Sequence, residues 1–223
     1  MNRGFLLKAW IGLTLLGGMA SCDREIEEPT LELAQDYMPL TIGKYWEYDV
    51  LETIYYGEND SEQSRYQLRD KIRSVYINDA SEQVFVVARS KSTNQLDLVK
   101  LYDYTLIVRE GSLVRTIQNQ PIVVLAANLT DGQVWDGNLY WSEQDDEFYL
   151  ERLGQNSIKV DQENEDDLIT FRDIRYESYE KGVGMTELYA EVLTYCSRND
   201  CLGDQLIDSG SKIQMNLINH GEE

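Results

Sequence analysis

The chain has 223 residues, with 20 Lys and Arg against 40 Asp and Glu, and therefore a formal net charge of −20 at pH 7. Nucleic acid binding depends on basic contacts to phosphates, so this charge excludes it and also disfavours adhesion to anionic headgroups. The length fits one domain with a core of its own.

Residues 1–21 have the layout of a secretory signal peptide. Arg3 and Lys8 precede or interrupt an apolar run, and small residues follow it. The run is shorter than the roughly 20 apolar residues that a membrane-spanning helix needs. We therefore predict that this segment is removed.

The segment ends at Ser21, and the sequence around this end is Met19-Ala20-Ser21-Cys22. It resembles the lipobox of bacterial lipoproteins, in which an apolar residue and two small residues precede an obligatory Cys. The resemblance implies that Cys22 carries a diacylglycerol and, after cleavage, a further acyl chain such as palmitate. Two or more acyl chains anchor a protein stably, so the membrane is an expected partner through lipid on Cys22. A plain secreted protein is the alternative.

Residues 22–36 are predicted to be the lipidated Cys and an acidic tether, because Asp23 to Pro29 is too polar to order itself. An Asp after the lipidated Cys resembles an inner-membrane retention signal of enteric bacteria. An acidic cluster there resembles a surface-export signal of Bacteroidetes, and a solvated spacer is a third interpretation. We expect a place in the outer membrane, with the cell surface favoured over the periplasmic face.

Residues 37–223 are predicted to form a single β-rich domain. Its first strand places Trp46, Tyr48 and Val50 on one face. A strand at 186–195 is expected to point Leu188 and Val192 inward, with Ala190 between them. Further strands are predicted at 64–77, 83–88, 98–109, 113–118, 148–152, 157–160, 169–179 and 211–218. Glu110-Gly111-Ser112 is predicted to turn the chain, so that residues 98–118 form a hairpin.

Two segments are harder to assign. Residues 121–128 fit a strand or a short helix, and residues 161–167 are predicted to be an acidic loop. No segment has the periodicity of a long helix. The expected fold class is all-β, or β-rich with minor helix, with an antiparallel curved sheet or partial barrel that hides its edges.

Four spaced motifs are distributed along the predicted domain: Tyr37-x-Pro39-Leu40-x-x-Gly43-x-x-Trp46-x-Tyr48, Gly132-x-x-Trp135-x-Gly137-Asn138, Tyr179-x-x-Gly182-Val183-Gly184, and Ser209-Gly210 with Leu217-Ile218. Together they resemble a group of uncharacterised Bacteroidetes lipoproteins. Met38 stands where an aromatic residue is usual in that group, and Lys44 where Asn or Asp is common. The resemblance implies a β-rich outer-membrane lipoprotein domain and transfers no catalytic residue.

The remaining cysteines, Cys196 and Cys201, are predicted to form a disulfide, as is usual outside the cytoplasm. They make a poor zinc site, because structural zinc takes four N or S ligands. The acidic run 161–167 is a weak candidate for calcium, since it lacks the spacing of a calcium loop. We therefore predict no metal and no cofactor.

Trp135 and Trp141 lie among Gly, Asn and Asp, and are candidates either for stacking on a ligand or for the core. We expect a non-enzymatic binding or accessory module for a glycan, protein or lipid ligand. A carrier that holds a lipid or other hydrophobic ligand in a β cavity is the alternative. A carboxylate-based hydrolase is a third, whereas triad chemistry needs a positioned histidine and His220 lies in the predicted tail.

Overall fold

The protein is described from a computed structural model that covers residues 32–58, 60–92 and 97–223 in detail. The signal peptide, Cys22 and the tether before residue 32 lie outside the described residues. In this part of the chain no helix has the length and apolar character to cross a membrane. The residues from Leu31 to Glu223 belong to one compact unit.

The described residues of this unit form one short helix and twelve strands. Their bounds are α1 Ala34–Tyr37, β1 Lys44–Gly57, β2 Asp60–Ile77, β3 Gln83–Ser92, β4 Val99–Arg109, β5 Ser112–Ile117, β6 Gln120–Leu125, β7 Val134–Asp136, β8 Glu147–Arg152, β9 Ser157–Asp166, β10 Phe171–Glu180, β11 Gly184–Tyr195 and β12 Ile207–Glu222.

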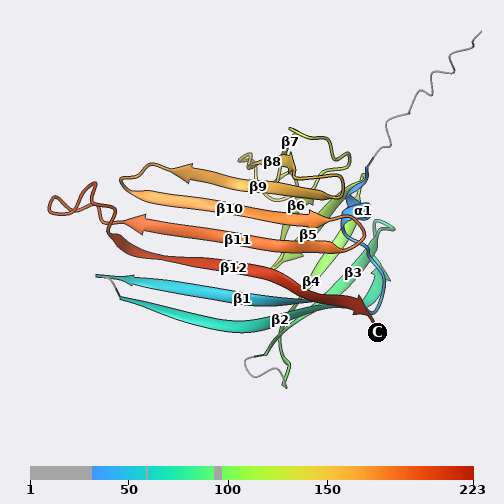
Figure 1. The fold of residues 1–223 in the computed structure, drawn as a ribbon. Coiled ribbons are helices and arrows are strands. Elements are labelled where there is room, and N and C mark those ends of the chain that lie inside the picture. The colour runs from blue at the N-terminus through green and yellow to red at the C-terminus, as the bar shows by residue number, and fades with distance from the viewer. Residues whose placement is uncertain (1–31, 59, 93–96) are drawn as a thin grey trace, which may run out of the picture. The chain divides into compact units, whose positions relative to one another are not determined.

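The strands form one antiparallel sheet in the order β6-β5-β4-β3-β2-β1-β12-β11-β10-β9-β8-β7 (Figure 1). The sheet curls until its two edges meet. Val123 N on β6 donates to Gly137 O at 2.9 Å, and Trp135 Nε1 on β7 donates to Val123 O at 2.8 Å. The result is a nearly closed barrel, which confirms the predicted all-β class.

The predicted organising strand is β1. Trp46, Tyr48 and Val50 all face the core and are fully buried, as expected. Trp46 Nε1 donates to Val183 O at 2.7 Å. Gly184 follows with φ +123°, and a Cβ there would lie 2.4 Å from Trp46 Nε1. Two motifs far apart in the sequence thus meet, and the close approach requires glycine.

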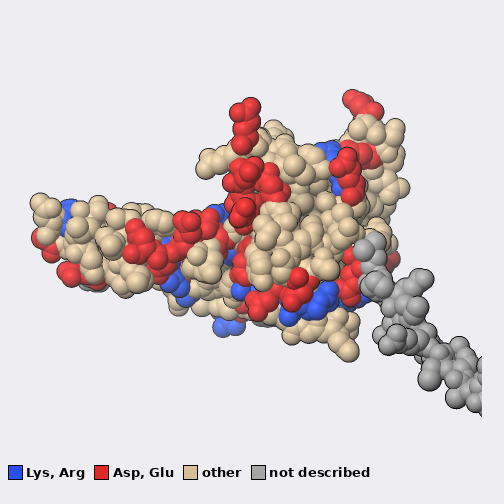
Figure 2. All heavy atoms as spheres, turned by 90° about the horizontal axis from the view of Figure 1, so that it is seen from above, with Lys and Arg blue, Asp and Glu red and all other residues tan. Residues whose placement is uncertain are grey.

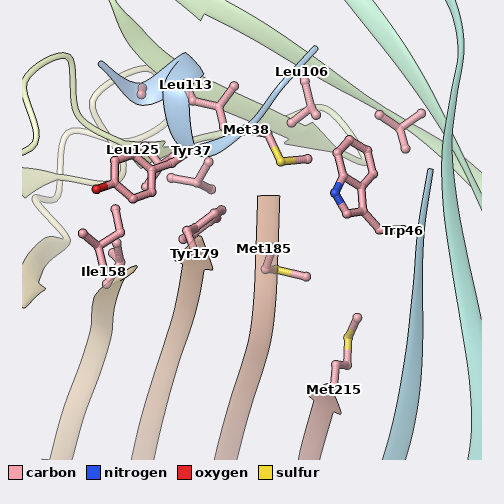
Figure 3. Close-up of a cluster of buried hydrophobic side chains, with 14 of the residues drawn as sticks. Tyr37, Met38, Trp46, Leu106, Leu113, Leu125, Ile158, Tyr179, Met185 and Met215 are labelled. Carbon is pink, nitrogen blue, oxygen red and sulfur yellow. The ribbon is translucent and has the colours of Figure 1, made fainter. Parts of the chain in front are cut away.

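The helix α1 packs at one end of the barrel. Ala34, Tyr37 and Met38 are buried there, and Tyr37 and Met38 lie among core side chains of the strands (Figure 3). Glu32, within the predicted tether, pairs with Arg152 on β8 at 2.6 Å. The packed domain therefore includes residues 32–36, which the sequence analysis assigned to the tether.

Several predicted elements are found and one is wrong. The hairpin at 98–118 is present as β4 and β5, and residues 120–125 are a strand rather than a helix. Residues 161–166, predicted to be a loop, are part of β9. The acidic residues can lie in a strand because basic side chains on the neighbouring strand β10 neutralise them. Arg172 pairs with Asp166 at 2.6 Å, and Arg175 lies 3.7 Å from Glu163.

Six strands continue past the barrel as a flat extension, which we call the arm (Figure 1). Within the described residues, β3 pairs with β2 only from Gln67 onward, and β8 pairs with β9 only as far as Asp161. Residues 60–66 and 162–166 are therefore the edges of the arm. It comprises residues 51–57, 60–66, 162–166, 171–175, 189–195 and 207–214.

Cys196 and Cys201 form a disulfide in the loop between β11 and β12, at the free end of the arm (Figure 1). Both cysteines are buried. Loop-closure entropy for so short a ring corresponds to a stabilisation of about 2 kcal/mol. The bridge compacts a tip that has little other core.

Candidate functional site

The barrel interior contains a buried ion pair between β2 and β3. The Arg89 guanidinium donates to both oxygens of Asp70, at 2.7 and 2.6 Å. Tyr104 OH on β4 donates to the same carboxylate at 3.0 Å. The bidentate geometry and the third donor satisfy a carboxylate that is almost completely enclosed.

A second buried pair lies across the barrel. Arg115 on β5 donates to Glu177 on β10 at 2.5 and 3.2 Å, and Tyr179 OH donates to the same carboxylate. Burial by itself would raise the pKa of Glu177, but the charge and hydrogen bonds of Arg115 and the Tyr179 hydroxyl outweigh burial and hold that pKa below its usual range. In each pair the buried carboxylate accepts hydrogen bonds from one arginine and one tyrosine.

These residues leave a central cavity of about 20 Å³, lined also by Met38, Leu106 and Met185. That volume holds about one water molecule. The barrel interior is filled by side chains, so the expectation of a lipid carried in a β cavity has no support there. The interior network is best understood as a polar core that fixes how the barrel closes.

An open depression of about 610 Å³ lies beside α1. Its apolar part includes Leu40, Phe85 and Val108, and its polar rim includes Glu82. Arg109 already binds both oxygens of Glu82, at 2.6 and 2.7 Å. The volume is that of a ligand site, but its one acidic side chain is occupied by a neighbour, so the depression offers no charged group for a ligand.

The two tryptophans predicted as ligand-stacking candidates have different surroundings. Trp135 is half-buried, bonds to Val123 O, and packs edge to face on Phe148 with ring centroids 6.0 Å apart. Because Trp135 lies on β7 and its hydrogen-bond acceptor lies on β6, this side chain joins the two edge strands of the sheet and helps to close the barrel. Trp141, in the loop between β7 and β8, is 51% exposed.

The acidic run does not converge on one point. Glu163 and Glu165 lie opposite Arg175 and Asp173 of β10, whereas Asp166 pairs with Arg172. A calcium site needs several oxygens around one position, and alternation along a strand separates them. His220, expected in a tail, is exposed within β12.

The inner arm face is the surface of the arm that continues the wall of the barrel interior. It begins at a row of core residues, in which Val50 pairs with Met215 and Met215 with Leu188. Side chains two and four residues further along each strand share that face. They form two rows across six strands: Ser64-Glu52-Ile213-Ala190-Arg175-Glu163, and Glu62-Ile54-Ser211-Val192-Asp173-Glu165.

The centre of the inner arm face is apolar and open to solvent. Ile54 is 37% exposed and Val192 is 41% exposed, with the half-buried Ile213 between them. Val192 was predicted to point inward, and it does lie on the core side of the sheet. Its strand has already left the barrel, so no other element covers it within the described residues.

The sides of the inner arm face are acidic. Its two rows contain the five carboxylates Glu52, Glu62, Glu163, Glu165 and Asp173 and the single guanidinium of Arg175, which leaves a formal charge of −4. Arg175 is committed to Asp173 at 2.7 Å. Figure 2, which views the molecule from above, shows acidic side chains spread along the arm and over the barrel, with fewer basic ones between them.

Sequence reasoning missed this surface, although one signal pointed to it. β1, β2 and β12 have 14, 18 and 16 residues, whereas an average strand has about 5–6. Strands of that length extend beyond a small barrel. Their extra residues form a sheet beyond the barrel, and the inner face of that sheet is covered by no other element within the described residues.

The fold and this surface define a nearly closed β-barrel with a projecting sheet. No family model and no curated protein matches the chain. It is similar to a crystal structure from Parabacteroides distasonis, of a protein provisionally described as a lipoprotein. The two share 12% identity, and the match covers 82% of this chain and 98% of that one, with a TM-score of 0.36.

Proposed function

We propose that the protein is a lipid-anchored protein of the outer membrane that binds a partner through its arm and catalyses no reaction. The observation that carries this proposal is the contrast between the two inner surfaces. The barrel interior is filled and its charges are paired, whereas the inner arm face is apolar, acidic at its sides and open. Exposed apolar surface of this kind marks interaction sites.

Several sequence features support the anchor. The lipobox ending at Cys22 places the lipid ahead of the acidic segment Asp23 to Glu28. The spaced motifs support membership of the uncharacterised Bacteroidetes outer-membrane lipoproteins. We propose that the domain faces the cell exterior, because the acidic cluster close to Cys22 resembles a surface-export signal.

The Cys22→Ser variant tests the anchor in the native host. The parent chain is expected to incorporate labelled palmitate and to sediment with the outer membrane, and the variant is expected to lose both properties. Protease treatment of intact cells should digest the parent domain while a periplasmic control survives. An unlabelled parent chain in the soluble fraction would exclude the anchor, and protection until the outer membrane is opened would exclude the surface location.

Site-specific crosslinking tests whether the arm binds a partner. A photoreactive residue at Val192 is expected to give a discrete adduct in the native envelope. The same residue at Ile77, which is 60% exposed at the barrel end of β2, provides the matched control. Equal labelling from both positions, or none from Val192, would mean that the arm holds no specific partner.

A further inference from the structure

We infer that the inner arm face binds a cationic amphipathic helix of a partner protein. This inference rests on the proposed function, because it names the chemistry of the partner that the arm would hold. It combines three observations: the width of the apolar stripe, the position of the carboxylates beside it, and the small side chains along its floor.

The apolar stripe has the width of a helix. Ile54, Ile213 and Val192 lie on β1, β12 and β11. Neighbouring strands are about 4.8 Å apart, so the stripe is about 10 Å wide. An α-helix with its side chains is about 10–12 Å across. A helix lying along the strands would cover these three side chains together.

The floor of the stripe permits close approach. Ser211 and Ala190 lie between or beside the larger apolar residues, and Thr194 and Ser209 continue the same face toward the tip. Small side chains let the helix lie close to the sheet. The open part of the stripe, from the Ile213 row to the Ser209 row, is four residues of strand and spans about 13 Å, which matches a helix of about nine residues.

The carboxylates stand where basic side chains of such a helix would reach. Glu62 on β2 lies on one side of the stripe, with Glu52 at its margin on β1, and Asp173 on β10 and Glu163 and Glu165 on β9 lie on the other side. Glu52 accepts a hydrogen bond from Tyr66 at 3.1 Å and Glu62 accepts one from Tyr56 at 3.4 Å. Lys or Arg stems of a partner helix can cross apolar surface to reach these carboxylates.

The same charges argue against other occupants. A second copy of this chain would bring a face of charge −4 against an identical one, and like charges in contact disfavour association. Anionic headgroups would be repelled in the same way. The segment from Asp23 to Glu28 of this chain is acidic, so the negatively charged inner arm face would repel it as well.

The test uses the full chain carrying Cys22→Ser and a dye-labelled 18-residue helical peptide of Leu, Ala and Lys with one apolar face. Two peptides serve as controls: a scramble of the same composition without an apolar face, and a version with Glu in place of Lys. Fluorescence anisotropy is expected to show saturable binding of the first peptide, at least tenfold weaker binding of the scramble and none of the Glu peptide.

Variants of the chain locate the binding surface. Ile54→Asn with Val192→Asn, and separately Glu62→Gln with Glu165→Gln, are each expected to raise the Kd at least tenfold. The matched controls, Ile77→Asn and Asp79→Asn with Glu110→Gln, change exposed residues at the barrel end of the sheet and are expected to leave the Kd unchanged. Unchanged circular dichroism would establish that the arm variants still fold.

Other results overturn the inference. If the scrambled peptide bound as tightly as the amphipathic one, or if the control variants raised the Kd as much as the arm variants, the binding would depend only on net charge and not on the inner arm face. If the chain dimerised at higher concentration and Val192→Asn abolished the dimer, the inner arm face would be a contact between two copies. If the chain bound phosphatidylglycerol vesicles and Val192→Asn abolished that binding, the face would be a membrane contact. A specific Val192 crosslink without peptide binding would reject this partner chemistry while leaving the proposed function intact.

Discussion

The Glu177→Gln variant is expected to lose about 3–5 kcal/mol of unfolding free energy, the cost of removing one partner from a buried ion pair. Arg115 would keep its charge inside the barrel without its carboxylate, and Tyr179 OH would lose a charged acceptor. Urea unfolding at pH 7, followed by circular dichroism, measures the change.

The same variant has a defined pH dependence. Because the pKa of Glu177 is lower in the folded protein than its ordinary value of 4.5, ionised Glu177 stabilises the fold above about pH 4.5. This contribution disappears as the pH falls through the lower folded pKa. The stability difference between parent and variant should therefore be full at pH 7 and shrink under acid conditions.

An exposed pair provides the control for Glu177. Asp49 on β1 and Arg65 on β2 lie on the outer surface of the sheet at the base of the arm, 2.8 Å apart, where water screens their attraction. Asp49→Asn should change the urea midpoint far less than Glu177→Gln. Similar effects from both variants, or a difference that does not depend on pH, would show that the interior pair does not stabilise the barrel in the way we describe.

The second large effect is expected at Trp46. Trp46→Ala removes a fully buried side chain from the centre of the sheet, and truncations of this kind cost about 3–5 kcal/mol. It also leaves Val183 O without its indole donor. Thermal unfolding followed by circular dichroism should show a clear fall in Tm.

Trp141→Ala is the matched control, since the same side chain is removed from an exposed loop. Its effect on the unfolding free energy should stay within about 0.5 kcal/mol. If Trp46→Ala were equally mild, the contact between β1 and the turn at Gly184 would not be central to the fold.

Local patterns predicted the parts of the fold that depend on neighbouring residues. Alternation placed Trp46, Tyr48 and Val50 inside, and turn residues predicted the hairpin at Glu110 and Gly111. Both residues there have positive φ, 50° and 85°, as a tight hairpin turn requires. Strand identity follows from such short-range preferences, so the all-β class could be predicted.

Long-range contacts account for what was missed. The acidic run at 161–166 looked like a loop because its neutralising cations, Arg172 and Arg175, are supplied by β10. The buried pair of Arg115 with Glu177 joins residues far apart in sequence, and no local pattern indicates it. The inner arm face likewise needs the register of six strands, which fixes which side chains lie together.

The place of β12 in the sheet has a consequence for how the chain must mature. β12 pairs with β1 on one side and β11 on the other, so the centre of the sheet is completed by the strand that comes last along the chain among the described strands. Until it emerges, the long edges of β1 and β11 remain without a partner, and such edges invite wrong pairing. Contacts between distant segments also form slowly. Translation or export that pauses before β12 would therefore leave an aggregation-prone intermediate with two long unpaired edges.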